Sequence, residues 1–548
     1  MDPTATTGIP APTFFTHVDR ALASRRARSL ARTLTDPTYT IDRDFASNDY
    51  LGLAHSPALA SAIHAATVAA SSADGTAPQP HGATGSRLLS GHTPRASALE
   101  ARLARLHGAE AALLFNSGYA ANLAVLATLP QPGDLIVLDE FVHASVWDGV
   151  RLGVGRKPNR APRHITVPHA DVSAVRDVIV AERERELADG VARPCSIFIA
   201  VEAVYSMDGT VAPLRELVGM IEELGDVNVH LIVDEAHSSG AMGLNGAGLV
   251  CELGLEEKIP FRLHTFGKGI GCHGAVFLCS AAVRDFLINY ARPLVYSTMM
   301  PTSALIAIEC AYTFLEEHAD QLQRDLQLRI ATFSSACSRY PSLDLVPSTT
   351  HIQGIRVAGG NAAVVRIARD LREQGWYTLP IRAPTVPRGA ERIQAIMLYA
   401  QHPATKQHLF NDVLAEVMLK FVSIEKMTLT LLVATQSLLD VHEILGRDVL
   451  NGRSELKSTR LRLGLAAKNY CVNGDQKDVL VPMRSLIGML KALDFMDPDE
   501  NGNKSRDRWL ASQFFDLHPW LCGQLYYMLL QLATDTIFSP ESPHRLLM

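Results

Sequence analysis

Three residues in the middle of the chain have the types and spacing of a covalent cofactor site. Asp234 ends the strand-like run LIVD, His237 follows it, and Lys268 stands between Gly267 and Gly269 in HTFGKGIG. A lysine in that setting is predicted to face a pocket, where it can form a Schiff base with pyridoxal phosphate. Asp234 would then pair with the protonated pyridine nitrogen, and His237 would reach the ring hydroxyl.

Two other kinds of site or contact could account for these residues. A phosphate-binding loop of the form GxxxxGK[ST] needs glycine at position 262 and serine or threonine at 269, where the chain has Arg262 and Gly269. That interpretation fails. An isolated aspartate–histidine pair is more often a structural hydrogen bond than a site, but Lys268 and the motifs below favour the cofactor site.

Further polar residues suit the phosphate and the ring of such a cofactor. FNSGYAANLAV places Ser117 and Gly118 before a helical run, and a helix N-terminus offers free amide donors to a phosphate. Thr265 and Ser206 add hydroxyl groups, although an N-cap or a turn explains each equally well. His143 follows the run LIVLDE and is expected to stack on the ring, with a buried core histidine as the alternative.

The elements that must position these residues alternate along the chain. Short runs rich in valine and isoleucine lie between helical patterns, at 135–140, 196–206, 229–238, 262–268 and 275–280. Such runs predict strands buried on both faces of a largely parallel α/β sheet. Ligands of these sheets bind at the carboxyl ends of the strands, where several of the polar residues stand.

Other parts of the chain have a different pattern. Residues 14–34 predict a helix with a basic face, or an ordinary surface helix with solvated arginines, and the pattern beyond about residue 404 is helical throughout. We expect an N-terminal arm and helix over 1–44, a large domain over 45–298, a small α+β domain over 299–404 and a helical extension of unknown function over 405–548.

Composition and charge narrow the classes of function. The chain has 548 residues, of which 47% are hydrophobic and 20% charged, so a folded globular protein is expected. A formal net charge of −6 gives no basic surface for nucleic acid, and no apolar run is long enough to span a membrane. We therefore expect a soluble, cytoplasmic protein that binds neither nucleic acid nor membranes.

No metal site is predicted. The eight cysteines are scattered without a CxxC pair, which indicates neither a disulfide framework nor a zinc site of the usual spacing. Segment 497–508 imitates a calcium loop, but Arg508 stands where a bidentate glutamate is needed. We interpret it as a solvated loop.

A set of ordered motifs resembles the pyridoxal-phosphate-dependent α-oxoamine synthases over about residues 20–393. The motifs are SNDYLGL (47–53), GATGSRLLSG (82–91), LLFNSGYAAN (113–122), HASVWDG (143–149), VEAVYSMDGTVAPL (201–214), VDEAHSSGAMG (233–243), TFGKGIG (265–271), ARPLVYSTMMP (291–301) and APTVPRG (383–389). The resemblance implies a fold-type I transferase of the α/β class, with a large mostly parallel-sheet domain and a small α+β domain.

The resemblance also implies roles for individual residues. The catalytic set is Lys268, His143, Asp234 and His237. The residues expected to bind pyridoxal 5'-phosphate are Gly118, Tyr119, His143, Ser206, Asp234, His237, Thr265, Lys268 and Thr298. The residues expected to line the substrate site are Arg32, Asn48, Glu202 and Thr385.

The family joins an amino acid to an acyl-CoA with loss of carbon dioxide and coenzyme A. TFGKG together with ARPLVYST is most similar to the branch that joins L-alanine to pimeloyl-CoA in biotin biosynthesis. Another amino acid or acyl-CoA, including those of sphingoid or secondary-metabolite synthases, is the alternative. Family members are homodimers, so Ser297 and Thr298 are expected to reach the neighbour's cofactor.

The chain departs from the family pattern at the end of the last motif. The family has PTVPxGxxRLR, whose second arginine binds the amino-acid carboxylate; here Arg392 stands at the first arginine and Gln394 at the second. A neutral amide lacks the charged, bidentate match of a guanidinium, so the sequence also allows a cofactor-binding but catalytically impaired scaffold. Segment 405–548, which follows, is either a fused helical domain or an erroneous gene model.

Overall fold

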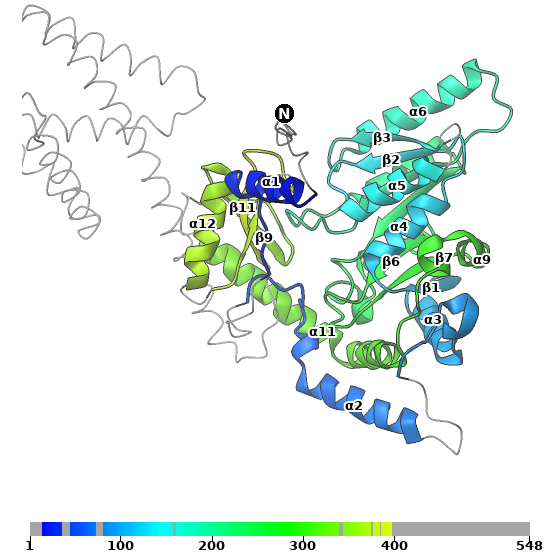
Figure 1. Ribbon diagram of the computed structural model, residues 1–548. Coiled ribbons are helices and arrows are strands. Elements are labelled where there is room, and N and C mark those ends of the chain that lie inside the picture. Colours follow the sequence, from blue (N-terminus) through cyan, green and yellow to red (C-terminus); the bar gives the residue numbers. More distant parts are fainter. Residues whose placement is uncertain are drawn as a thin grey trace, which may run out of the picture. The chain divides into compact units, whose positions relative to one another are not determined.

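Two β-sheets organise the part of the chain that the structure describes. The structure is a computed structural model and describes residues 14–34, 44–72, 81–156, 161–338, 343–373, 376–383 and 385–396. Within them the chain forms one seven-stranded and one four-stranded sheet (Figure 1). The predicted extension 405–548, with the calcium-like segment 497–508, lies outside these residues.

The large sheet is mostly parallel, as predicted. Its strands, in spatial order, are β1 (Ala111–Phe115), β7 (Ala275–Cys279), β6 (Phe261–Thr265), β5 (Val229–Asp234), β4 (Ile197–Glu202), β2 (Leu135–Asp139) and β3 (Arg163–Val167). Strand β7 runs antiparallel to both of its neighbours, and the other pairings are parallel. The α/β class expected from the sequence is confirmed.

Helices cover both faces of this sheet. They are α4 (Gly118–Thr128), α5 (Ala144–Arg156), α6 (Val172–Ala188), α7 (Leu214–Leu224), α8 (Leu249–Glu252), α9 (Ala281–Tyr290) and α10 (Arg292–Val295). Alternate residues of β2 enter different cores: Ile136 packs in the cluster that contains α4 and α5, and Val137 in the cluster that contains α6 and α7. This burial on both faces explains the continuous apolar runs in the sequence.

The small sheet is antiparallel and shares a core with its surroundings. Its order is β10 (Leu379–Ile381), β11 (Arg392–Ile396), β9 (Ile352–Arg356) and β8 (Leu345–Val346). The remaining helices are α1 (Phe14–Ala27), α2 (Pro57–Ser72), α3 (Pro94–Leu106), α11 (Thr302–Ser338) and α12 (Gly360–Glu373), with single turns at Leu53–His55, Arg87–Gly91 and Leu244–Gly246.

Helix α11 links the two sheets. One buried cluster contains residues of α3, α11, α12 and the small sheet, and α11 also packs against α2. Because this core is continuous, the domain bounds 45–298 and 299–404 stay a prediction. Among the described helices, none combines the length and the apolar character needed to cross a membrane.

A buried histidine ties α3 to α11 and the turn before α8. His107 is fully buried; its Nδ1 donates to the Ala247 carbonyl at 3.0 Å, and its Nε2 accepts from the Tyr312 hydroxyl at 3.2 Å. Burial, helped by the charge of Arg262, lowers the pKa of His107 to about 3. The folded protein therefore holds this ring neutral at pH values where the unfolded chain protonates it.

This neutral ring predicts a pH-dependent contribution to stability. Because the folded pKa lies below the unfolded value, the stabilisation by His107 is complete above about pH 6.5 and decreases by about 1.4 kcal/mol per pH unit as the pH falls towards 4.5. The difference in unfolding free energy between the unaltered chain and His107→Asn, measured by denaturant titration, should shrink at that rate. A constant difference for His107→Asn would contradict this assignment.

Candidate functional site

The carboxyl ends of three adjacent strands bring the predicted central residues together. Glu202 ends β4 and Asp234 ends β5, and the two are register partners in the sheet. Lys268 lies three residues beyond the end of β6, which pairs with β5. Because parallel strands finish at the same edge, the topology places two carboxyl groups and one amine at a single point.

Lys268 contacts a neutral histidine. Its Nζ lies 2.7 Å from His237 Nε2. Burial lowers the pKa of Lys268 below its usual value, although the carboxylates of Asp234 and Glu202 oppose the shift. Burial and the positive charge of Lys268 lower the pKa of His237 well below its usual value, so its imidazole is uncharged at neutral pH.

Asp234 is held by donors from two directions. Asn122 Nδ2 donates to Asp234 Oδ2 at 2.7 Å, and the Ala236 amide donates to Oδ1 at 2.9 Å. Asn122 also donates to Ser145 Oγ, which in turn lies 2.7 Å from Nδ1 of His143. These bonds fix the carboxylate and connect it to the histidine that is expected to stack on a ring.

Glu202 is buried with one oxygen free of protein partners. Its Oε2 accepts from the Ser206 amide at 3.2 Å, whereas Oε1 has no hydrogen-bond partner in the described part of the chain. Burial and the neighbouring Asp234 raise the pKa of Glu202 well above its usual value, against the influence of Lys268. A protonated Glu202 is therefore a hydrogen-bond donor within the site.

The N-terminus of α4 lies against β6. Ser117 caps the helix by accepting from the Ala120 amide at 3.1 Å. A Cβ atom added to Gly118 would lie 2.2 Å from Thr265 Oγ1, so only glycine permits this approach. The first turn of α4 and the Thr265 hydroxyl thus form one cluster of donors, which suits a phosphate. Tyr119, half-exposed, bonds Asp148, and its ring lies edge-on to His143.

The predicted substrate residues fall into two groups. Asn48 accepts a hydrogen bond from Tyr50, which contacts His237, so Asn48 joins Glu202 near Lys268. Arg32 and Thr385 lie instead around Arg382. Burial, and then the charge of Arg32, lowers the pKa of Arg382, and the Thr385 amide donates to the Arg382 carbonyl. No hydrogen bond between described residues joins this second group to Lys268.

Thr298 bonds residues other than those around Lys268. Its carbonyl accepts from Asn116 Nδ2 at 2.8 Å, and it forms an isolated bridge with Ser86. No described residue of the Lys268 cluster bonds to it. Its predicted contact with a cofactor therefore stays a prediction, and within this chain it is unsupported.

Gln394 occupies a buried position with a defined partner. Its Nε2 donates to the Ser206 carbonyl at 2.6 Å, and the side chain is 2% exposed. Arg392, on the same face of β11, donates through Nε to the Ala390 carbonyl, and burial lowers its pKa. The amide at 394 thus connects the small sheet to the loop that follows β4.

Sequence reasoning missed Asn122, Ser145, Tyr50 and His351. Asn122 stands four residues after Gly118, so helical spacing places both on one face of α4 and was a usable signal. Ser145 and Tyr50 lie inside the quoted motifs without a distinguishing pattern. His351 precedes β9, and no feature of the sequence indicates that the small sheet brings it to Tyr50.

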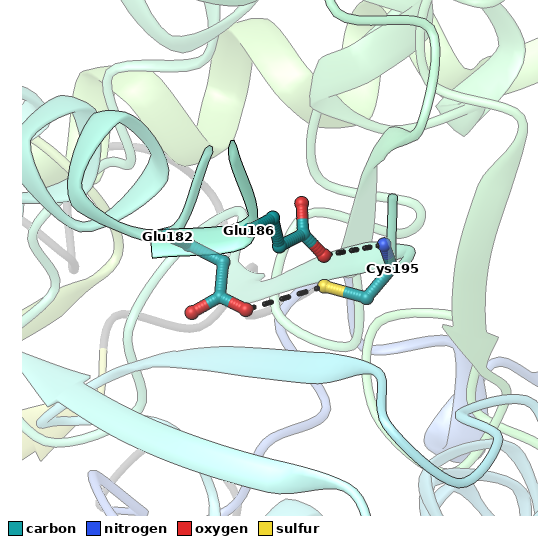
Figure 2. Close-up of side chains that lie close together, drawn as sticks. All are labelled: Glu182, Glu186 and Cys195. Carbon is teal, nitrogen blue, oxygen red and sulfur yellow. Dashed lines mark hydrogen bonds between the residues drawn. The ribbon is translucent and has the colours of Figure 1, made fainter. Parts of the chain in front are cut away.

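A second group of polar side chains lies away from this site. Glu182 and Glu186 of α6 converge on Cys195, as Figure 2 shows. The carboxylates are already paired: Glu182 with Arg163 and Arg185, and Glu186 with Arg183. Burial and the bond to Glu186 raise the pKa of the Cys195 thiol to about 12, so it stays protonated. We interpret the group as ion pairs that fasten α6 to the start of β4.

Comparisons with known proteins agree on one family. The model of the family "Aminotransferase class I and II" matches residues 41–399. An 8-amino-7-oxononanoate synthase of Emericella nidulans is 40% identical over 384 residues, 69% of this chain and 89% of that protein. One from Trichlorobacter lovleyi is 35% identical over 387 residues, 69% of this chain and 90% of that protein.

Two solved structures have the same architecture. A serine palmitoyltransferase of Sphingomonas wittichii has a TM-score of 0.62 and 25% identity, and the match covers 76% of this chain and 99% of that chain. An 8-amino-7-oxononanoate synthase of Francisella tularensis has a TM-score of 0.54 and 26% identity, with 70% and 98% covered. Each match covers nearly the whole of the other chain.

The hydrogen bonds of Asn122 predict the effect of removing it. Asn122→Ala leaves Asp234 Oδ2 without its 2.7 Å donor in a buried site, so the carboxylate should be less well oriented. We expect retention of pyridoxal phosphate to weaken by about tenfold, measured by dialysis and absorbance. Asn289→Ala, which removes an exposed amide that bonds the Asp285 carbonyl, is the control and should change nothing. Equal retention in both variants would show that Asn122 does not support the site.

Proposed function

The chain belongs to the aminotransferase class I and II family, and from that premise we propose that it joins L-alanine to pimeloyl-CoA, releasing carbon dioxide and coenzyme A. The chain is a pyridoxal-phosphate-dependent enzyme of the α-oxoamine synthase type. The observation that supports the substrate pair is 40% identity, over 89% of its length, to a protein named 8-amino-7-oxononanoate synthase. The product would be an amino ketone of biotin biosynthesis.

The side chains present fit pyridoxal phosphate. Lys268 offers an amine for the covalent bond, and Asp234 offers a fixed carboxylate for the pyridine nitrogen. The start of α4 with Thr265 offers donors for the phosphate, and Oε1 of Glu202 is a buried polar atom that lacks a protein partner. When bound, this cofactor withdraws electrons from the Cα atom of an amino acid.

The described residues then have separate tasks in the proposed reaction. Because burial lowers the pKa of Lys268, a larger fraction of its Nζ is unprotonated and can accept the Cα proton as general base. His237, held neutral, orients that amine through its Nε2. Asp234 supplies a negative charge, and Glu202, when protonated, is a hydrogen-bond donor on the side that has no protein partner.

The assembly and compartment are also proposals. We propose a homodimer in which Ser297 and Thr298 reach the site of the partner subunit. Within its own chain, Thr298 bonds Asn116 and pairs with Ser86, and no described residue of the Lys268 cluster bonds to it. All the cysteines in the described segments are free thiols, which favours the cytoplasm as the compartment.

A second candidate is a related synthase with other substrates. The resemblance to serine palmitoyltransferase structures, with a TM-score of 0.62, supports a longer acyl chain or serine as an alternative. A third candidate, a cofactor-binding scaffold, rests on Gln394, which donates to Ser206 where the family carries arginine.

Lys268 carries the first test of this proposal. The purified chain, loaded with pyridoxal phosphate, should be yellow and should release coenzyme A from pimeloyl-CoA with alanine, whereas Lys268→Ala should lose both properties because it lacks the amine. Lys258→Ala, which removes an exposed lysine paired with Glu222, is the control. If coenzyme A were released only with serine and palmitoyl-CoA, the second candidate would be favoured. If no pair of substrates led to release of coenzyme A, the scaffold would be favoured.

Charge at position 394 gives the second test. If an amino-acid carboxylate binds there, Gln394→Arg should lower the KM for alanine, and Gln394→Glu, nearly identical in shape to Gln, should raise it by roughly tenfold through repulsion. Steady-state kinetics at saturating acyl-CoA measure both. Equal KM values for the two variants would mean that the carboxylate binds elsewhere and that Gln394 serves only to hold the loop of Ser206.

A further inference from the structure

A chain of hydrogen bonds continues from Lys268 to the segment before α2. Lys268 Nζ lies 2.7 Å from His237 Nε2, and His237 Nδ1 lies 2.5 Å from the Tyr50 hydroxyl. That hydroxyl donates to Asn48 Oδ1 at 3.1 Å. Tyr50 is fully buried, and burial raises its pKa well above the usual value, so the hydroxyl keeps its proton.

The directions of these bonds determine where the proton of His237 lies. A phenol has one hydrogen, and Tyr50 gives it to Asn48. When that hydrogen goes to Asn48, the Tyr50 oxygen accepts from His237, and the imidazole proton then lies on Nδ1. Nε2 is left as an acceptor, and Lys268 donates to it.

The groups around His237 keep this arrangement uncharged. Burial is the main reason that its pKa is low, and Lys268, His351 and His143 add positive charge to the same surroundings. A second proton on the ring would turn Nε2 into a donor that faces the Lys268 amine. The single bond to Tyr50 then decides between the two neutral tautomers.

His351 holds the Tyr50 ring from the side of the small sheet. The two ring centroids are 3.9 Å apart, and His351 is 1% exposed. Its Nε2 has no hydrogen-bond partner in the described part of the chain. A phenylalanine would make the same ring contact without burying an unpaired nitrogen, so the two side chains can be compared at this position.

We propose that Tyr50 is a positioning residue that fixes the Nδ1–H tautomer of His237, and that His351 holds Tyr50 in the position where it does so. Neither side chain reaches Lys268 directly; both act through His237. When Nε2 of His237 is an acceptor, one N–H bond of Lys268 Nζ points to it. The other hydrogens or the lone pair of Nζ then point towards the rest of the site. Because His351 precedes β9, the small sheet thereby helps to set the orientation of the amine.

Tyr50→Phe tests the proposal because it removes the acceptor and keeps the ring. With the purified full chain loaded with pyridoxal phosphate, the readout is the pH midpoint of the visible absorbance of the bound cofactor. In the unaltered chain, Nε2 of His237 accepts a hydrogen bond from the nitrogen of Lys268 and so favours the protonated state of that nitrogen. Without the Tyr50 oxygen this tautomer is no longer fixed, so the midpoint should fall by about 0.5 pH unit or more. In turnover, kcat should fall by roughly tenfold with the KM for the amino acid within about twofold.

Tyr312→Phe is the matched control. Tyr312 is also fully buried and also bonds a histidine, His107, which lies outside the Lys268 chain. Its removal should leave the absorbance midpoint where it was, even if the thermal midpoint of unfolding falls. An unchanged absorbance midpoint in Tyr50→Phe, or equal shifts in both variants, would overturn the proposal.

Variants of His351 test whether this residue holds Tyr50 in position. Their outcome does not depend on whether Tyr50→Phe folds. His351→Ala removes the ring and should shift the absorbance midpoint in the same direction; His351→Phe, which keeps the ring contact with Tyr50, should shift it less. Equal titration of His351→Ala and the unaltered chain would overturn the role of His351. The inference concerns the site of the proposed function, but the titration needs no substrate, so a yellow protein that releases no coenzyme A would refute the proposed reaction alone.

Discussion

A lysine amine held away from water beside two carboxyl groups is the interaction on which the rest of the site depends. An isolated buried ammonium is costly, so Lys268 loses basicity, and Asp234 and Glu202 limit that loss. The balance leaves an amine whose pKa is lower than that of an exposed lysine. The parallel strands bring these three groups together, because β4, β5 and β6 end at one edge of the sheet.

The residues around this amine are held in position by other residues that take no part in the reaction themselves. Asn122 and the Ala236 amide fix Asp234, and Tyr50 fixes His237. Such supporting bonds determine orientation, and an error of one ångström at a reacting atom lowers the rate strongly. The close contact of Gly118 with Thr265 belongs to the same group, because it brings the start of α4 to the end of β6.

The small sheet contributes to the site through two contacts with different chemistry. Gln394 donates to the loop that carries Ser206, and His351 packs against Tyr50. Both side chains are almost fully buried, so the position of the small sheet and the geometry around Lys268 are coupled. This chain has Gln394 where the family has a charged arginine, and the difference therefore affects the position of the Ser206 loop as well as carboxylate binding.

Sequence patterns predicted five of the seven strands of the large sheet and the residues at their ends, because burial on both faces requires continuous apolar runs and because Asp234, His237 and Lys268 follow such runs directly. Strands β1 and β3 were not predicted. Asn122 was within reach through its helical spacing from Gly118. The tertiary structure alone decided which groups meet across the fold: the proton on His237 depends on Tyr50, about which no local pattern is informative, and His351 reaches Tyr50 only because the small sheet packs there. Local periodicity reports burial and spacing along one element, whereas the partner of a buried polar atom is set by elements that are far apart in the chain.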